Sequence, residues 1–276
     1  MSRLQIGAAQ FGNIYGLTNN SRSLEPTECW SILDLALSNG IDEVDTSPTY
    51  GQSLSIISKY RGGSLKITSK IKIKGLGREG ILEELSFQRK KLCDFHTLHT
   101  ILIHDFASLD ESELISLQKI IDEVGEIMFG ISVYSSWEIT QASRNLVGIK
   151  TIQFPINILN QEFLPMISSE QKGDYRFVAR SLMLQGAIDW ESERNRFRSH
   201  SSILKLRTIA TALGLRPIEL VVAFAKKVNA DSILFGFASE KQLQDFLDIW
   251  LSDMDLQLDF SNFSSSDLDL IDPRRW

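Results

Sequence analysis

Apolar positions recur along this chain with two alternating periods. Short runs such as Leu4–Ala9 are typical of buried strands, whereas Leu33 and Leu37 repeat at the spacing of a helix face. Pro26 suits the first turn of that helix, and Asn39-Gly40 is a stop signal. The pattern predicts strands over residues 4–9, 41–46, 65–70, 99–104, 127–133, 150–157, 176–182 and 231–236, and helices from Pro26 to the stop signal and over about 79–92, 110–124, 137–144, 161–170, 202–213, 217–228 and 240–250.

Strands and helices alternate throughout, and no linker rich in Pro, Gly or Ser separates them. Such alternation predicts an α/β fold with a parallel sheet. Eight strands in 276 residues suit a closed (β/α)8 TIM barrel, which commonly reaches this length as one unit. We therefore expect residues 1–276 to form a single barrel domain.

Alternate residues of a barrel strand face the interior, so side-chain parity predicts which residues meet inside. In the strand 99–104 the count places His104 inward, and in 65–70 it places Lys70 inward. The second strand fits less well, because Glu43 shares a face with Asp45. Polar groups at the C-terminal mouth of such a barrel are where active sites are made.

The turn Asp45–Gly51 holds a carboxylate and a phenol five residues apart, and Lys70 and His104 are predicted at the same rim. Each of the four side chains also has an ordinary interpretation. Asp45 could cap the turn, and Tyr50 could be a half-buried loop aromatic. Lys70 could be a solvated lysine and His104 a core histidine, so no single residue decides the function.

Together the four residues could protonate the oxygen of a substrate. A free phenol has a pKa near 10, and a nearby ammonium such as that of Lys70 lowers it. Asp45 supplies the anionic partner that a desolvated ammonium needs. His104 could bond a substrate carbonyl oxygen or tune the phenol of Tyr50. None of these groups is a hydride source, so a reductase would require a nicotinamide cofactor.

The order and spacing of these residues resemble the aldo-keto reductase superfamily, specifically its bacterial aldo/keto reductases. The resemblance covers about Leu4 to Leu247. The motifs that carry it are Asp-Thr-x-x-x-Tyr-Gly at 45–51, Ser-Lys at 69–70, Leu-Ile-His-Asp at 102–105, Gly-Ile-Ser at 130–132, Gln153 with Asn157, Arg180-Ser181, Leu-Gln-Gly at 184–186, and Gly236 through Leu243.

The resemblance implies NAD(P)(H)-dependent reduction of an aldehyde or ketone, or the reverse oxidation, with no metal. Tyr50 would be the general acid, Lys70 would lower its pKa, Asp45 would pair with Lys70, and His104 would orient the carbonyl. Ser132 and Gln153 would hold the nicotinamide carboxamide of the cofactor. Arg180 and Ser181 would lie along the nicotinamide and pyrophosphate. The adenosine phosphate end would be bound by the region of Gly236, Ala238, Ser239 and Gln242. The opening motif at 9–19 is similar to a subgroup often associated with surface sugars, which suggests a sugar-like substrate.

Several positions depart from the family pattern. Val133, Phe235 and Ala238 replace the common Asn, Pro and Arg, and Asp245-Phe246 replaces Glu-Asn. Only Lys241 offers a nearby cation to a 2′-phosphate, although we favour NADP(H) over NAD(H). One alternative is therefore a cofactor-binding protein with little catalysis, acting as a redox sensor or scaffold subunit. A barrel lyase or isomerase without nicotinamide is a further alternative.

Composition narrows the range of partners. The chain is 43% hydrophobic and 23% charged with a net charge of −6, which argues against a nucleic-acid surface. No apolar run is long enough for a membrane span, and the N-terminus lacks a secretory apolar core. We expect a cytoplasmic monomer or weak homo-oligomer with Cys29 and Cys93 as free thiols, acting on a small carbonyl compound.

Two further segments have no assigned role. The basic cluster Lys70, Lys72, Lys74 and Arg78 is interpreted as a solvated loop, with a phosphate contact as the alternative. The tail 251–276 is predicted to pack across the barrel, and its last four residues suggest no function.

Overall fold

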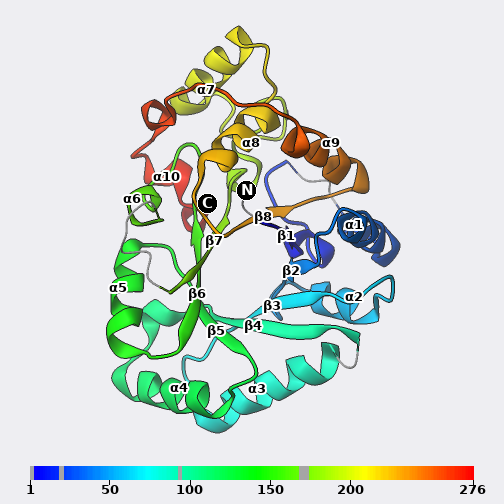
Figure 1. Cartoon of the computed structure of the whole chain (residues 1–276). Coiled ribbons are helices and arrows are strands. Elements are labelled where there is room, and N and C mark those ends of the chain that lie inside the picture. The colour runs from blue at the N-terminus through cyan, green and yellow to red at the C-terminus, as the bar shows by residue number, and fades with distance from the viewer. Residues whose placement is uncertain (1–2, 19–21, 93–94, 168–173) are drawn as a thin grey trace.

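The computed structural model describes residues 3–18, 22–92, 95–167 and 174–276 of the chain. Within these residues, parallel strands close into an eight-stranded barrel in the order of the sequence, and helices surround it (Figure 1). β1 closes the ring by pairing with β8 over its full length. This architecture confirms the predicted (β/α)8 barrel. The strands are β1 (Arg3–Gly7), β2 (Glu43–Asp45), β3 (Lys66–Ile71), β4 (Thr97–Ile103), β5 (Met128–Ser132), β6 (Ile149–Pro155), β7 (Arg176–Arg180) and β8 (Ser232–Gly236).

The helices begin where the sequence provides starting signals. Pro26 occupies the first turn of α1, where Glu25 and Glu28 form reciprocal caps, and Ser135 and Glu138 cap α5 in the same way. The helices are α1 (Pro26–Ser38), α2 (Ser53–Lys59), α3 (Gly77–Leu92), α4 (Glu111–Glu123), α5 (Ser136–Asn145), α6 (Leu164–Ile167), α7 (Ser201–Ala212), α8 (Pro217–Lys227), α9 (Glu240–Leu251) and α10 (Leu268–Ile271).

Some predicted boundaries were wrong for local reasons. The strand predicted over 4–9 ends at Gly7, because Ala9–Phe11 forms a 3₁₀ turn. The strand predicted over 176–182 ends at Arg180, because Ser181 has a φ of 66° and leaves the extended region.

Two helices also differ from the prediction. α2 was not predicted, because its seven residues are too few to show a helical period. The helix predicted over 161–170 is reduced to the four residues of α6, and positions 168–170 lie outside the described residues. Asn157 instead bends the preceding chain, since its Oδ1 accepts from the backbone nitrogens of Leu159 and Asn160 at 3.0 and 2.9 Å.

A charged cluster fills the barrel at its N-terminal end. Glu43 Oε2 accepts from Arg176 at 2.5 Å and from Gln5 Nε2 at 2.6 Å. Arg176 also donates to Ser232 Oγ at 2.7 Å. Glu43 is buried, so it shares the inward face with Asp45 without breaking the parity of β2. Its partner Arg176 lies on β7, far away in the sequence.

The C-terminal tail packs across the outside of the barrel, as predicted. It leaves α9 and crosses α8, where the rings of Phe260 and Phe224 lie 5.5 Å apart (Figure 1, red). It then passes α7, where Lys205 Nζ donates to the carbonyl of Asn262 at 2.6 Å. The tail thereby returns the end of the chain toward the barrel mouth.

No single helix among the described residues is long and apolar enough to cross a membrane. α7 and α8 together satisfy a length and hydropathy criterion, but they meet at a bend of 95°.

Candidate active site

Lys70 and Asp45 form a buried ion pair at the C-terminal mouth of the barrel. Lys70 Nζ donates to Asp45 Oδ1, and both residues are 2% exposed. Burial disfavours the ammonium, but the Asp45 carboxylate and then Tyr50 outweigh that effect and raise the pKa of Lys70. The side chain therefore remains a fixed cation at neutral pH.

A polar row continues from this ion pair across the barrel. Gln153 Nε2 donates to Asp45 Oδ2 at 2.7 Å, and Ser132 Oγ donates to Gln153 Oε1 at 3.4 Å. All four members are buried. The structure thus joins two predicted cofactor residues, Ser132 and Gln153, directly to the predicted catalytic pair, a link that sequence spacing alone did not indicate.

Tyr50 lies over the ion pair. Lys70 Nζ is 5.1 Å from the centroid of its ring. The loop that carries Tyr50 is held by close backbone packing, because a Cβ added to Gly12 would lie 2.1 Å from the Tyr50 carbonyl oxygen. Only glycine fits at position 12, so the β1–α1 loop helps to fix the position of the Tyr50 backbone and thus of its phenol.

His104 adjoins the ion pair from the end of β4. Burial lowers its pKa to about 4, with Lys70, Arg180 and Lys72 contributing in that order. Its Nδ1 is buried and has no hydrogen-bond partner among the described residues. His104 is therefore a neutral imidazole at physiological pH, which can offer one N–H and one lone pair.

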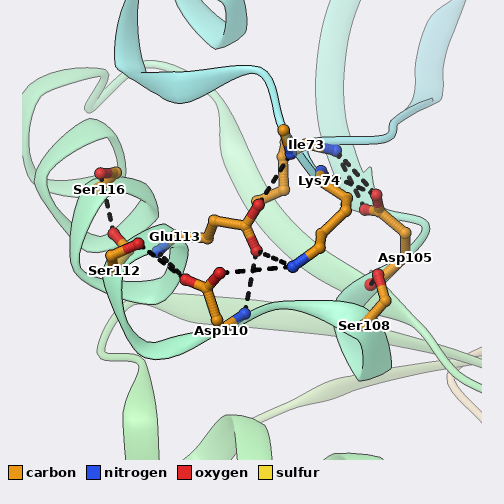
Figure 2. A network of polar contacts seen from close by, with 9 residues as sticks. Ile73, Lys74, Asp105, Ser108, Asp110, Ser112, Glu113 and Ser116 are labelled. Atoms are coloured by element: carbon orange, nitrogen blue, oxygen red, sulfur yellow. Dashed lines mark hydrogen bonds and ion pairs between the residues drawn. The ribbon is translucent and has the colours of Figure 1, made fainter.

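A carboxylate clamp fixes the chain immediately after His104. Asp105 accepts from the backbone nitrogens of Ile73 at 3.1 Å and Lys74 at 2.9 Å (Figure 2). Lys74 Nζ in turn contacts Glu113 at 2.9 Å and Asp110 at 3.4 Å. The clamp ties the exit of β3 to the exit of β4, and the sequence analysis did not assign it a role.

Arg180 lies at the end of β7 against an aromatic ring. Its guanidinium carbon is 4.5 Å from the ring centroid of Tyr134, and it donates to the Val133 carbonyl at 3.1 Å. Arg274 of the tail lies 4.1 Å from the same centroid. No carboxylate pairs with Arg180 in the described part of the chain. Tyr134 and Arg274 were not predicted as site residues, because their contact joins the β5–α5 loop to the last residues of the chain.

The residues that follow Arg180 have unusual backbone conformations. Ser181, Leu184 and Gln185 have φ values of 66°, 47° and 52°. Such conformations in residues other than glycine are costly and concentrate at functional sites. Arg180 Nη1 donates to Ser181 Oγ at 3.1 Å, so the predicted pair Arg180-Ser181 is in contact.

The predicted residues after β8 form a separate capped turn. Ser239 Oγ accepts from the Gln242 nitrogen at 3.1 Å, and Gln242 Oε1 accepts from the Ala238 nitrogen at 2.8 Å. Gly236 ends β8, where an added Cβ would lie 2.4 Å from Gln10 Oε1. Among the described residues, none of these four forms a hydrogen bond or an ion pair with Lys70 or Asp45.

Two of the departures from the family pattern near β8, Phe235 and Phe246, are explained by packing. The rings of Phe235 and Phe246 lie 4.4 Å apart, and Phe237 lies 5.3 Å from Phe246. Phe235 and Phe246 therefore belong to one aromatic cluster, which anchors the turn after β8 through apolar contacts.

The cysteines lie away from this chemistry. Cys29 is a free, buried thiol in α1, and Cys93 lies outside the described residues. Among the residues that the structure describes, no group of three or more His, Cys, Asp or Glu side chains could hold a metal ion.

Comparison with known proteins adds a family to this geometry. The model of the aldo/keto reductase family matches residues 3–258. A search of curated proteins finds no significant match. Among solved structures, glycerol dehydrogenase of Gluconobacter oxydans is 16% identical with a TM-score of 0.68, covering 99% of this chain and 93% of its own. A Pseudomonas aeruginosa protein named for the aldo-keto reductases is 17% identical with a TM-score of 0.64, covering 90% and 89%.

Proposed function

The chain belongs to the aldo/keto reductase family, and we propose that it reduces an aldehyde or ketone to an alcohol with Tyr50 as the general acid. Carbonyl reduction is the general chemistry of this family. The observation that carries the proposal is the buried pair of Lys70 and Asp45 beneath the ring of Tyr50, with the neutral imidazole of His104 beside it.

The residues at the mouth fit a nicotinamide dinucleotide. Gln153 Oε1 and Ser132 Oγ offer an acceptor and a hydroxyl to a carboxamide, while Gln153 Nε2 stays on Asp45. Arg180 has no carboxylate partner among the described residues, which suits an anionic ligand. The turn at Gly236, Ala238, Ser239 and Gln242 would hold the adenosine end.

A bound nicotinamide dinucleotide supplies the hydride. Tyr50 gives its hydroxyl proton to the carbonyl oxygen as negative charge develops there. Lys70 stabilises the phenolate that remains, and Asp45 fixes the ammonium in place. His104 donates a hydrogen bond that orients the carbonyl. Its lowered pKa keeps it uncharged, so it does not compete with Tyr50 as a proton source.

We propose NADP(H) ahead of NAD(H) as the cofactor. Lys241, beside the cap of α9, is the cation of this turn that would face a 2′-phosphate. The similar solved structures include a protein named for 2,5-diketo-D-gluconic acid reductase B. That name and the opening motif at 9–19 support a sugar-like carbonyl substrate.

The test follows nicotinamide absorbance with NADPH and NADH and a panel of aldehydes and keto sugars. Replacing Tyr50→Phe removes the proton donor and should lower kcat by about 10²- to 10⁴-fold. Binding of cofactor, titrated by fluorescence, should change little in this variant. Tight cofactor binding without turnover of any carbonyl would instead favour a binding protein, and equal kcat in the wild type and the variant would contradict the role of Tyr50.

A further inference from the structure

The basic cluster that follows the middle of β3 contains one residue without a partner. Lys70, Lys74 and Arg78 each form an ion pair, whereas Lys72 has neither a hydrogen bond nor an ion pair with any described residue. The interpretation of the whole cluster as a solvated loop is therefore wrong for Lys70, which is buried. The partners are Asp45 for Lys70, Glu113 and Asp110 for Lys74, and Glu123 for Arg78.

Lys72 lines a cavity of about 190 Å³ together with His104. Lys70 also borders it, so the cavity lies next to the residues of the barrel mouth. Ser47 and Thr49 add hydroxyl groups to the wall. The volume is below the roughly 300–1,000 Å³ of sites for larger ligands. It suits a small polar portion of a substrate.

The Asp105 clamp holds the backbone next to both Lys72 and His104. The nitrogen of Ile73 donates to Asp105 (Figure 2). Lys72 immediately precedes Ile73 in the sequence, and His104 immediately precedes Asp105. The two cavity residues are thus held by opposite sides of one set of hydrogen bonds. The backbone at both positions is therefore held in place, while the exposed side chain of Lys72 is free to move onto a ligand that His104 contacts.

Among the described residues, the cavity wall carries one cation without a protein partner, Lys72, and one carboxylate, Glu84. Glu84 is the carboxylate on the wall, and its Oε1 already accepts from Gln88 Nε2 at 2.8 Å. Gln88 Nε2 also donates to the Lys70 carbonyl at 3.1 Å, which fixes this side chain on the α3 side. Glu84 forms no ion pair with Lys72, so the ammonium of Lys72 remains available.

We propose that the carbonyl substrate carries a carboxylate or phosphate group, which binds Lys72 in this cavity. The inference rests on the proposed function, since it places the substrate carbonyl at Tyr50 and His104. Glu84 and the hydroxyls of Ser47 and Thr49 bind hydroxyl groups of the same molecule. The substrate class is accordingly an acidic or phosphorylated sugar.

Two matched pairs of carbonyl compounds test this inference. D-glucuronate is compared with neutral D-glucuronamide, and D-glyceraldehyde 3-phosphate with D-glyceraldehyde, at saturating cofactor. Replacing Lys72→Gln should raise KM for a charged member about tenfold or more, because a charge-assisted hydrogen bond is lost, with kcat nearly unchanged. KM for the neutral members should stay within about twofold, and Lys72→Arg should restore much of the loss.

Lys66→Gln is the control, since Lys66 begins β3, the strand that Lys72 directly follows, and pairs with Asp42 at 2.8 Å. It removes the same charge and should change none of the four KM values. If KM rises in Lys72→Gln for D-glucuronate, the bound group is a carboxylate; if it rises for D-glyceraldehyde 3-phosphate, the bound group is a phosphate. Equal KM values for charged and neutral members, unchanged in Lys72→Gln, would overturn the inference while leaving the proposed function intact.

A binding measurement separates the two proposals if no compound is reduced. D-glucuronate and inorganic phosphate are titrated by calorimetry into the wild-type protein and Lys72→Gln. Binding that weakens about tenfold in the variant supports the anion site even without turnover. Binding that is absent or equal in both proteins overturns it.

Discussion

The two carboxylates on the inward face of β2 form ion pairs at opposite ends of the barrel. Glu43 pairs with Arg176 at the N-terminal end of the barrel, and Asp45 pairs with Lys70 at the mouth. The mouth pair is the more buried, with side chains 2% and 3% exposed against 22% and 8% at the other end. Both carboxylates are nevertheless buried and each is paired with a cation, so pairing alone does not indicate which end of the barrel carries the chemistry.

The neighbours of each pair do distinguish them. At the N-terminal end Arg176 also donates to Ser232, and Glu43 also accepts from Gln5, so the charged groups bond to protein. At the mouth, the ion pair adjoins the ring of Tyr50 and an imidazole of His104 whose Nδ1 is unbonded. The mouth pair thus lies beside a phenol and an imidazole of lowered pKa, and perturbed titratable groups of this kind concentrate at functional sites.

Lys70→Met should have the largest effect, because it leaves Asp45 buried without a cation and removes the partner of Tyr50. We expect a loss of about 3–5 kcal/mol in the free energy of unfolding. We also expect kcat to fall by about 10²-fold or more in the protein that remains folded. Urea denaturation and the nicotinamide assay measure the two effects, and a stable variant with normal kcat would contradict both roles.

Arg176→Met should affect stability alone. It leaves Glu43 buried without a cation, so the free energy of unfolding should again fall by about 3–5 kcal/mol. The exposure of Arg176 places the expected value toward the lower end of that range. kcat of the folded protein should stay within about twofold, as measured below the temperature at which unfolding begins. A large drop in kcat with unchanged stability would mean that the two ends of the barrel are coupled.

His104→Gln should have the smallest effect, on the pH dependence of stability. Burial lowers the folded pKa of His104 to about 4 from an ordinary 6.5. The unfolded chain therefore binds more protons between these values, and stability falls as the pH drops from about 6.5 to about 4. Denaturation midpoints across this window should show a weaker pH dependence in the variant, by up to about one proton. An unchanged slope would indicate that His104 is not desolvated in the folded protein.

The sequence predicted those parts of the molecule that depend on the periodic spacing of apolar and polar side chains along a strand or helix. Strand parity placed Lys70 and His104 at the rim, because side chains alternate with a period of two. The interaction of Glu43 with Arg176 was beyond this reasoning, since the partner lies on β7. The contact of Tyr134 with Arg274 depends on how the tail docks. The Asp105 clamp depends on a loop conformation that no residue period encodes.

The proposed difference between the two ends of the barrel can be measured by comparing kcat/KM of Asp45→Asn and Glu43→Gln. Each substitution neutralises one carboxylate of β2 while keeping the shape of the side chain. Asp45→Asn weakens a charge-assisted bond to Lys70 and should lower kcat/KM by about 10- to 100-fold. Glu43→Gln should leave kcat/KM within about twofold and lower only the free energy of unfolding. Equal losses of kcat/KM in the two variants would contradict the distinction between the two ends of the barrel.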